Sequence, residues 1–473
     1  MIATSQTHDL SNAADVDMQG TAVEAIDGPA LEALQDTAAR RLRILISAYS
    51  CAPGSGSENG IGWNTSRTAA ERHEVWVLTR SDHGFGRNHR DLIEAELKRN
   101  PQPYLHVLYC DLPGWLRHVI GVQAVAYLWQ LKAYLTARRA HRTIGFDLAH
   151  HISWVRWYTP SLLHLLPVPF IWGPIGGGER LPRTFLRGIS GKGLYEEAKR
   201  GLLNAFAPFD PLVRLAAQRS ILVIANSNET HRRLVSLGAT RIRIFGESGI
   251  DDWILDLGED VGPAPERPVR FVSLNRLLHW KGVHLGLEAF ARLGRHDAIY
   301  TIVGEGPEKS FLENRAKWLG IADRVEFLSN LSRVEWMTTL RQADALVHAC
   351  TYNSGNAISL EAMALAKPVI CLQRGGILGQ VNKETGYCMP ASSSQEAVAG
   401  LRDAMAAVAA DREAAAAKGR RGRLRVQQHF TWAARSARFD RFYHEALDLH
   451  HRQRTEQPAS QPKDSSPLAG SDA

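Results

Sequence analysis

The chain has 473 residues and a net charge of +7, and 44% of its residues are hydrophobic and 22% charged. This is the composition of a globular protein, which excludes a collagen, a coiled coil and a wholly disordered chain. The length predicts two or three domains. The positive charge is too dilute for a dedicated nucleic-acid binder, so we expect no nucleic-acid partner.

The ends of the chain and its cysteines give no sign of secretion. Residues 1–40 are polar, lack the features of a signal peptide and are expected to be disordered, with a short helix at Ala30–Ala39. Residues 453–473 are rich in Pro, Ser and Gln and are also expected to be disordered. The most apolar stretch, Val119–Leu135, is interrupted by polar residues, so we expect no membrane span. The five cysteines form no C-x-x-C pair, which fits a cytoplasmic location.

Short apolar strands alternate with amphipathic helices, a pattern typical of parallel βαβ units. In the first half, a Gly/Ser-rich turn separates the first strand from a helix at about Gly62–Arg72. The strands predicted there are Arg43–Tyr49, Glu74–Thr79, Leu105–Tyr109, Leu148–His151, Phe170–Trp172 and Leu222–Asn226.

A second alternation follows a Pro/Gly-rich linker, GEDVGPAPERP. Its predicted strands are Arg270–Leu274, Ala298–Val303, Val325–Leu328, Ala345–Ala349 and Pro368–Leu372. Ser332 with Glu335, and Ser393 with Glu396, predict helix starts with capping boxes. The last helix, Trp432–Leu449, carries an aromatic stripe that we interpret as a packing face. The sequence therefore predicts an α/β protein of two doubly wound units that face each other across a cleft.

The turn after the first strand holds Gly54, Gly56, Gly60 and Gly62. Glycines there let backbone N–H groups approach an anion at a helix N-terminus. Asn59 occupies the place of the third glycine of the dinucleotide fingerprint, and the second strand is followed by an arginine instead of an acidic residue. An NAD(P)-dependent oxidoreductase is therefore a weakly supported alternative, and a tight turn explains the glycines equally well.

Two permanent cations, Arg276 and Lys281, follow the first strand of the second half. The carboxyl end of a parallel strand is where doubly wound folds bind ligands. An arginine fork and a lysine point charge together suit a diphosphate, although surface cations in a loop would look the same.

Small residues lead into a helix further along the second half. Asn353, Gly355, Asn356 and Ala357 precede or begin the helix, whose free N–H groups suit a phosphate. Glu361, two turns further, suits ribose hydroxyls, while its alternative interpretation is a solvated helix carboxylate.

A pair of histidines, His150 and His151, ends a predicted strand, and a Gly-rich loop follows Trp172. A single histidine is usually structural. Its place at the carboxyl end of a strand nevertheless favours exposure to the cleft.

Several of these motifs together resemble glycosyltransferase family 4, whose members are retaining enzymes of the GT-B fold. The resemblance covers roughly residues 41–450. Its signatures are Arg276, Lys281-Gly282, Gly304-Glu-Gly306-Pro307 and Leu360-Glu361-Ala-Met-Ala followed by Lys-Pro-Val-Ile, with Tyr49–Trp63, WGPIGGGERLP and ANSNET in the first half.

The resemblance implies a domain plan. Residues 41–263 would form the acceptor-binding domain, completed by the final helix 432–450, and residues 264–431 the nucleotide-sugar-binding domain. Donor-binding residues would be Gly60, Gly62, Gly304, Gly306, Asn353, Gly355, Asn356, Ala357 and Glu361. Asn353 departs from the family, which commonly has a glutamate there.

The resemblance also implies a front-face retaining mechanism with Arg276, Lys281 and His151 as catalytic residues, and His150 as the alternative histidine. The two cations would stabilise the charge that grows on the leaving diphosphate. No D-x-D motif stands at a strand end, so we expect neither a metal nor another cofactor.

The expected partners are a nucleotide-sugar donor and a glycan or lipid-linked oligosaccharide acceptor, in bacterial polysaccharide or envelope synthesis. A basic and aromatic segment, residues 115–142, and a basic cluster at residues 418–425 suggest contact with the anionic inner face of the cytoplasmic membrane, although a packed helix is the alternative. A sugar phosphorylase and a non-catalytic sugar-nucleotide-binding scaffold are further alternatives.

Overall fold

The computed structural model describes residues 40–81, 88–154, 156–258, 267–352 and 357–456. The chain divides into two compact units, residues 1–41 and 42–473, and only Arg40 and Arg41 of the first are described. The predicted disordered leader with its helix at 30–39, and the tail beyond residue 456, lie outside the described residues. Everything below concerns the second unit.

The first sheet has seven parallel strands in the order β3-β2-β1-β4-β5-β6-β7. They are β1 (Arg43–Ala48), β2 (Glu74–Thr79), β3 (Leu105–Tyr109), β4 (Leu148–Ser153), β5 (Phe170–Ile175), β6 (Leu222–Ala225) and β7 (Ile242–Ile244). The edge strand β7 was not predicted, because it has only three residues and two of them are exposed.

The second sheet has six parallel strands in the order β10-β9-β8-β11-β12-β13. They are β8 (Val269–Leu274), β9 (Ala298–Val303), β10 (Val325–Leu328), β11 (Ala345–His348), β12 (Val369–Leu372) and β13 (Gly386–Met389). Each sheet reverses its winding once, between β1 and β4 and between β8 and β11. The predicted fold class is confirmed, and these two switch points are where such sheets bind ligands.

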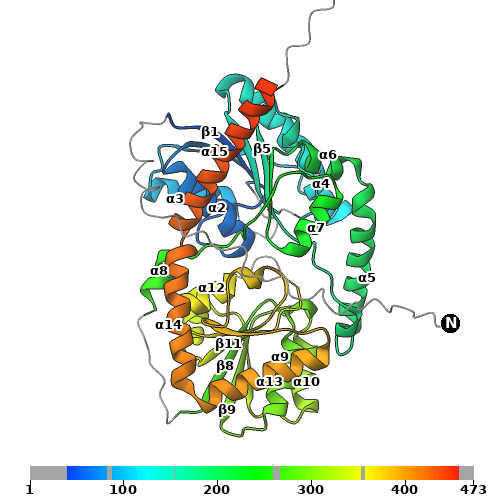
Figure 1. Ribbon diagram of the computed structural model, residues 1–473, viewed down its shortest axis with the longest axis vertical. Helices are drawn as coiled ribbons and strands as arrows, with labels where there is room; N and C mark the ends of the chain where they lie inside the picture. Colours follow the sequence, from blue (N-terminus) through cyan, green and yellow to red (C-terminus); the bar gives the residue numbers. More distant parts are fainter. Residues whose placement is uncertain (1–39, 82–87, 155, 259–266, 353–356, 457–473) are drawn as a thin grey trace, which may run out of the picture. The chain divides into compact units, whose positions relative to one another are not determined.

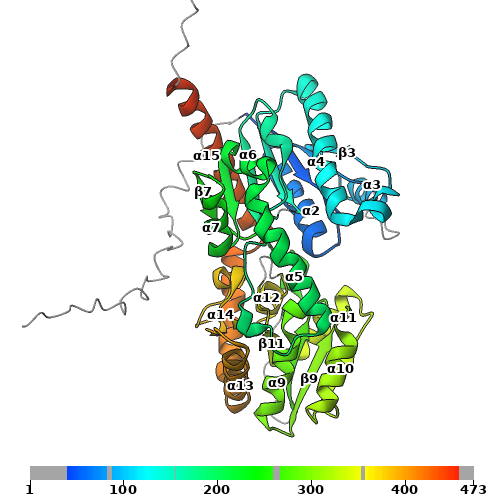
Figure 2. The same ribbon diagram turned by 90° about the vertical axis from the view of Figure 1, so that its right-hand side faces the viewer.

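Helices flank both sheets (Figures 1 and 2). They are α2 (Ser57–Ala70), α3 (His89–Arg99), α4 (Leu116–Ile144), α5 (Gly191–Phe206), α6 (Pro211–Arg219), α7 (Asn228–Ser236), α8 (Asp252–Asp256), α9 (Val283–Leu293), α10 (Lys309–Trp318), α11 (Arg333–Gln342), α12 (Ala357–Ala364), α13 (Ser394–Ala410), α14 (Arg412–His429) and α15 (Trp432–Glu456). Short 3₁₀ turns are η1 (Leu162–Leu165), η2 (Arg183–Phe185), η3 (Ala207–Phe209), η4 (His279–Lys281) and η5 (Gly375–Gly379).

The last helix, α15, packs on the first sheet and on α2, far from it in sequence (Figure 1). Phe439, Phe442 and Tyr443 are buried in one apolar cluster with β1 and β2 side chains, so the aromatic stripe is confirmed as a packing face. The helix continues to Glu456, past the predicted start of the tail at residue 453.

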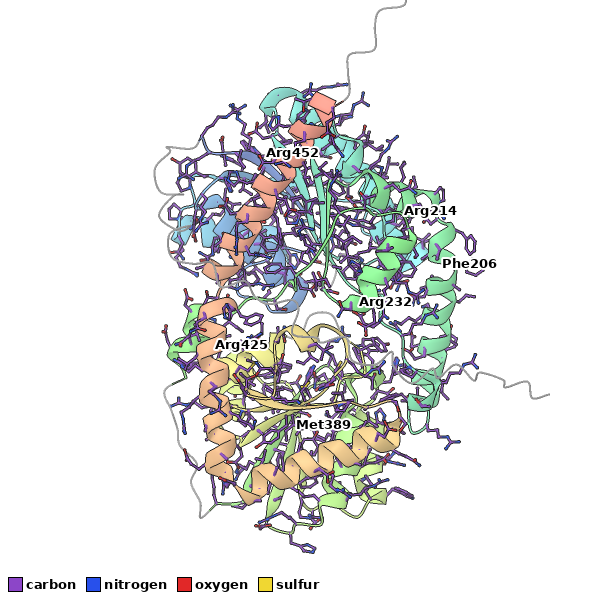
Figure 3. All side chains as sticks on the ribbon, viewed as in Figure 1. Phe206, Arg214, Arg232, Met389, Arg425 and Arg452 are labelled. Carbon is purple, nitrogen blue, oxygen red and sulfur yellow. The ribbon has the colours of Figure 1, made fainter. Side chains whose placement is uncertain are left out.

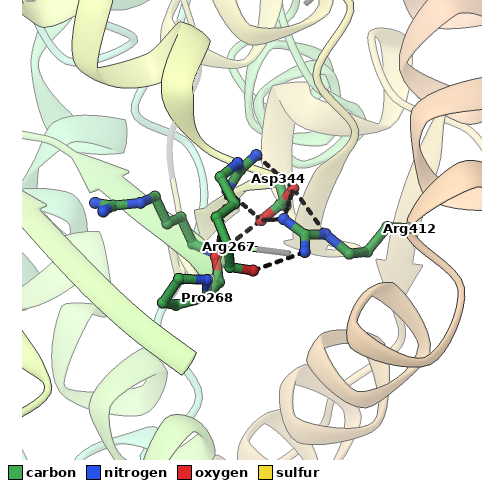
Figure 4. Close-up of polar contacts among 5 residues, drawn as sticks. Arg267, Pro268, Asp344 and Arg412 are labelled. Carbon is green, nitrogen blue, oxygen red and sulfur yellow. Dashed lines mark hydrogen bonds and ion pairs between the residues drawn. The ribbon is translucent and has the colours of Figure 1, made fainter. Parts of the chain in front are cut away.

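A buried carboxylate ties together the start of the second sheet and α14 (Figure 4). Asp344 accepts hydrogen bonds from Arg267 at 2.9 and 3.0 Å, from Arg412 at 3.1 Å, and from the backbone N–H of Arg270 at 2.8 Å. Its side chain is only 5% exposed. The two arginines therefore neutralise the buried carboxylate of Asp344. Their hydrogen bonds hold the segment before β8 next to the start of α14.

The basic cluster at residues 418–425 serves the fold. Arg421 donates to the Glu384 carbonyl at 3.0 Å, Arg423 to the Leu255 carbonyl at 2.8 Å, and Arg425 to the Gln380 and Gly379 carbonyls at 3.0 Å. Figure 3 shows Arg425 on α14. These three arginines are hydrogen-bonded to backbone carbonyls of the protein itself. Their geometry therefore gives no support to the predicted contact of the cluster with a membrane.

Candidate functional site

A cavity of about 290 Å³ opens at the carboxyl edge of the second sheet. Its lining comes from the loops that follow β8, β9 and β10 and from the start of α11: Asn275, Arg276, Gly304, Glu305, Gly306, Asn330, Leu331 and Trp336. Three predicted site residues, Arg276, Gly304 and Gly306, thus meet around one cavity.

The two cavity glycines are required by close backbone contact. A Cβ atom at Gly304 would lie 1.8 Å from the Asn275 carbonyl oxygen, and one at Gly306 would lie 2.3 Å from the Leu277 carbonyl oxygen. The backbone N–H of Leu277 also donates to the Glu305 carbonyl at 2.8 Å. The loop after β9 therefore holds the loop after β8 in place and fixes the backbone on both sides of Arg276.

Lys281 ends the 3₁₀ turn η4, on the side of the loop that faces β11. Gly282 has a φ of +67°, and a Cβ atom there would lie 1.9 Å from the Ala349 carbonyl oxygen. The Thr351 N–H donates to the Trp280 carbonyl at 2.9 Å. These contacts place Lys281 at the switch point between β8 and β11.

A buried hydrogen-bond network, which was not predicted from the sequence, holds the loop after β8 in place. Glu197 on α5 is hydrogen-bonded to His279 of η4 at 3.0 Å and accepts a hydrogen bond from Tyr352, whose ring lies 3.9 Å below the guanidinium of Arg200. Burial alone would raise the pKa of Glu197, but these hydrogen bonds and the Arg200 charge outweigh burial and lower it. The partners are about 80 and 155 residues apart along the chain, and no local pattern signals their contact.

Glu361 is buried on α12 and forms a bidentate ion pair with Arg333 of α11. This geometry rules out the solvated-carboxylate interpretation. A carboxylate can accept further hydrogen bonds beyond two from an arginine, so binding of ribose hydroxyls stays a prediction. Ala357 begins α12. Asn353, Gly355 and Asn356 lie outside the described residues.

Gly60 and Gly62 lie within α2 and not in the turn before it. The helix begins at Ser57, earlier than the predicted start near Gly62. Cβ atoms at Gly60 and Gly62 would lie 2.1 and 2.2 Å from the carbonyl oxygens of Ser55 and Ser50. Close packing of the helix on the preceding loop explains both glycines, and their predicted role in donor binding gains no support from the geometry.

The two histidines are buried in the middle of β4, which continues to Ser153, so the prediction that they end the strand is wrong. Both ring nitrogens of His150 are engaged, Nε2 with the Gly173 carbonyl at 2.7 Å and Nδ1 with the Tyr443 hydroxyl at 3.1 Å, which marks it as structural. His151 Nδ1 lies 3.0 Å from the Ser47 hydroxyl, and its side chain is 1% exposed. Burial lowers the pKa of His150 to about 4 and of His151 to about 3, so both are neutral near pH 7. Contact between His151 and a sugar stays a prediction.

The two doubly wound sheets have the GT-B fold, and Arg276 lines the cavity of the second sheet. Residues 259–422 match the sequence model of the family Glycosyl transferases group 1. This match over the second half of the chain confirms the predicted family resemblance and the class of enzyme at the level of this domain.

Curated relatives agree with this assignment. Glycogen synthase of Mycobacterium tuberculosis is 32% identical over 170 residues, which cover 35% of this chain and 40% of the relative. The GDP-mannose-dependent alpha-(1-6)-phosphatidylinositol monomannoside mannosyltransferase of the same organism is 31% identical over 187 residues, 37% of this chain and 47% of the relative. The chain thus spans less than half the length of these two relatives.

The solved structure of sucrose-phosphate synthase from Thermosynechococcus elongatus superposes with a TM-score of 0.62 at 18% identity, covering 86% of this chain and all of that one. At this identity the likeness concerns the fold. It extends over both sheets, whereas the family match covers only the second.

Proposed function

We propose that the protein is a retaining glycosyltransferase that moves a sugar from a nucleotide-sugar to a glycan or lipid-linked acceptor in bacterial envelope or polysaccharide synthesis. The observation that carries the proposal is the cavity at the carboxyl edge of the second sheet. Arg276 is in its lining, and Lys281 lies on the same loop, on the side that faces β11. A relative of this domain is GDP-mannose-dependent, which supports a nucleotide-sugar donor.

The chemistry follows from the placement of charge. Transfer breaks the bond between the anomeric carbon and the diphosphate oxygen, and negative charge grows on the leaving group. Fixed cations stabilise that charge more in the transition state than in the ground state. Arg276 and Lys281 supply such cations from a loop that glycine contacts hold rigid. We propose that they replace a metal ion, and that neutral His151 contacts the transferred sugar.

Thermal unfolding of the full chain with UDP-, GDP- and ADP-sugars, each with EDTA or Mg²⁺, tests the donor site. A ligand at 100 times its Kd stabilises a protein by about 2.7 kcal/mol, which is readily seen. We expect one nucleotide-sugar to raise the Tm without Mg²⁺, and Arg276→Ala to abolish the shift. Arg270→Ala is the matched control, because Arg270 lies near the amino end of β8. A shift that needs Mg²⁺ contradicts the metal-free proposal, and a shift that survives Arg276→Ala contradicts the site.

None of the helices in the described part of the chain is long and apolar enough to cross a bilayer. For the proposed contact with a membrane surface, the candidate is the exposed face of α5. Helix α5 buries polar residues and exposes apolar ones. Gly193, Glu197 and Asn204 face the protein, while Leu194, Tyr195, Leu202 and Phe206 are 44%, 67%, 60% and 64% exposed. Figure 3 shows Phe206 pointing away from the body of the protein.

Cations accompany this face. Lys192 and Lys199 are exposed on α5, and α4 adds exposed apolar residues near its middle, including Leu128 and Leu131. The Tyr127 hydroxyl, on α4, donates to Asp210 at 2.9 Å and so connects α4 to the start of α6. An apolar helix face flanked by lysines binds the surface of an anionic bilayer.

Vesicle sedimentation tests this surface. We expect binding to vesicles that contain an anionic phospholipid and not to purely zwitterionic ones, and loss of binding in the double variant Leu202→Glu/Phe206→Glu. Trp318→Glu is the control, since Trp318 is 73% exposed but lies on α10. Equal binding of the double variant and the control contradicts the assignment to α5.

A further inference from the structure

The carboxyl edge of the first sheet gathers three glutamates that no function has yet been given. Glu58 lies in the first turn of α2, Glu179 follows β5, and Glu247 follows β7. Although they come from segments far apart in the sequence, their charges act on one another: Glu58 and Glu179 both raise the pKa of Glu247. The carboxyl edge of a doubly wound sheet is where its ligands bind.

Each of the three carboxylates is hydrogen-bonded at only one of its oxygens among the described residues. Glu58 Oε2 accepts the Trp154 N–H at 2.8 Å, and Glu247 Oε2 accepts the Asn226 amide at 3.0 Å. Both side chains are partly exposed. Glu179 differs, because it is buried and accepts hydrogen bonds from Ser227 at 2.6 Å and Thr230 at 3.4 Å.

Independent polar groups beside the glutamates also lack partners. Asn226 is 4% exposed, and its Oδ1 makes no hydrogen bond in the described part of the chain, although its Nδ2 donates to Glu247. Arg435 on α15 is 5% exposed, lies 3.5 Å over the ring of Phe245, and has no partner for Nε and Nη2 among the same residues. Buried polar groups are normally satisfied, so these atoms point to a missing ligand or water.

The electrostatics narrow the class of ligand. Burial, and then the charges of Glu58 and Glu179, raise the pKa of Glu247 to about 8, against the hydrogen bond from Asn226 and the charge of Arg435. Burial also raises the pKa of Glu58, while the Trp154 N–H and Arg156 act in the opposite direction. An added anion would increase this repulsion. A hydroxyl group can donate to the carboxylates and Asn226 and can accept from a guanidinium.

We propose that Glu58, Asn226 and Glu247, with Arg435 behind them, form a subsite for the hydroxyl groups of a neutral sugar or polyol, and that it excludes sugars carrying a carboxylate or phosphate next to those hydroxyls. The proposed function identifies the ligand of this subsite as the sugar acceptor, and that identification rests on it. The preference of this subsite for hydroxyl groups is argued from contacts at the first sheet and does not depend on the donor site.

Ligand-observed saturation-transfer NMR on the full chain tests the subsite without turnover. The probes are glucose, mannose and myo-inositol, compared with glucuronate and glucose 6-phosphate. We expect at least one neutral probe to bind and the anionic probes to bind about tenfold more weakly or not at all. The comparison is made above pH 8, where Glu247 is ionised in the folded protein. There Glu247→Gln removes the charge but keeps the size of the side chain, and Asn226→Ala removes the unpartnered oxygen, so each should weaken the neutral probe about tenfold.

Glu74→Gln is the matched control, because Glu74 begins β2 at the opposite edge of the same sheet. Three results would overturn the proposal: anionic probes that bind as well as neutral ones, no binding by any neutral probe, or neutral binding unchanged in both variants. The nucleotide-induced Tm shift in Glu247→Gln separates the two proposals, since it should persist. A failure of every nucleotide to bind would count against the donor site and not against this subsite.

Discussion

The two sheets are wound in the same order but present different ionisable residues at their carboxyl edges. After β8, the second sheet presents Arg276 and Lys281 beside glycine loops and an open cavity. The first sheet presents Glu58, Glu179 and Glu247. One topology thus supplies a basic edge suited to a diphosphate and an acidic edge suited to hydroxyl groups. The chemistry lies in the loops and not in the winding.

The largest effect should come from removing the anion that holds the second half together. Asp344→Ala leaves Arg267 and Arg412 without their buried partner. Breaking one side of a buried ion pair costs about 3–5 kcal/mol of unfolding free energy. Denaturant unfolding would measure it, with Asp403→Ala, an exposed partner of Arg402, as control. A loss no larger than that of the control would show that the Asp344 contacts contribute little.

At the basic edge, Arg276→Ala or Lys281→Ala should each lower kcat/KM about 10²- to 10³-fold, the scale of losing one electrostatic donor in a transition state. Steady-state kinetics with the donor identified by thermal shift would measure this. The acidic-edge variant Asn226→Ala should instead act mainly on the KM for the acceptor. Near-normal turnover of Arg276→Ala would contradict the proposal that the carboxyl edge of the second sheet stabilises the leaving diphosphate.

A smaller effect is expected at Glu361. If its carboxylate holds ribose hydroxyls, Glu361→Ala should weaken binding of the nucleoside diphosphate about tenfold, the value of a charge-assisted hydrogen bond. Calorimetry should show little further loss with a 2′,3′-dideoxy nucleotide, which lacks those hydroxyls. An equal loss for both nucleotides would mean that Glu361 acts only through its pair with Arg333.

The last prediction concerns the pH dependence of the unfolding free energy at Glu247. The pKa of Glu247 is raised to about 8, so the folded protein retains a proton that the unfolded chain releases near pH 4.5. Stability contributed at this site therefore falls as pH rises from about 4.5 to 8. Relative to wild type, Glu247→Gln should therefore gain stability across that range, because glutamine does not titrate. Parallel stability curves would contradict the prediction.

Much of the fold could be predicted because buried parallel strands are continuous apolar runs. The strands β2, β3, β9 and β10 lie at their predicted residues, and the capping box of Ser332 and Glu335 opens α11 as expected. The edge strands β7 and β13 escaped prediction, because they are short and only partly buried. The start of α2 was misjudged, because Gly60 and Gly62 suggested a turn although the helix needs them for packing.

The site could be predicted where its residues follow strands of known position, as Arg276, Gly304 and Gly306 do. Long-range partners could not. The pair of Arg333 with Glu361, and the contact of Glu197 with His279, depend on how separate segments meet, which no local spacing encodes. The burial of His150 likewise depends on Tyr443, 293 residues later in the chain.

The dependence of the first sheet on α15 has a consequence for biosynthesis. Phe439, Phe442, Tyr443 and Ala446 cover apolar side chains of β1 and β2, which are made some 370–400 residues earlier. On the ribosome, that face of the first sheet must remain uncovered until almost the whole chain has been synthesised. The second sheet, whose strands and helices lie between residues 269 and 429, can close first. The amino-terminal sheet is therefore completed last, and a chain that stops before residue 439 would expose its unfinished face to chaperones and proteases.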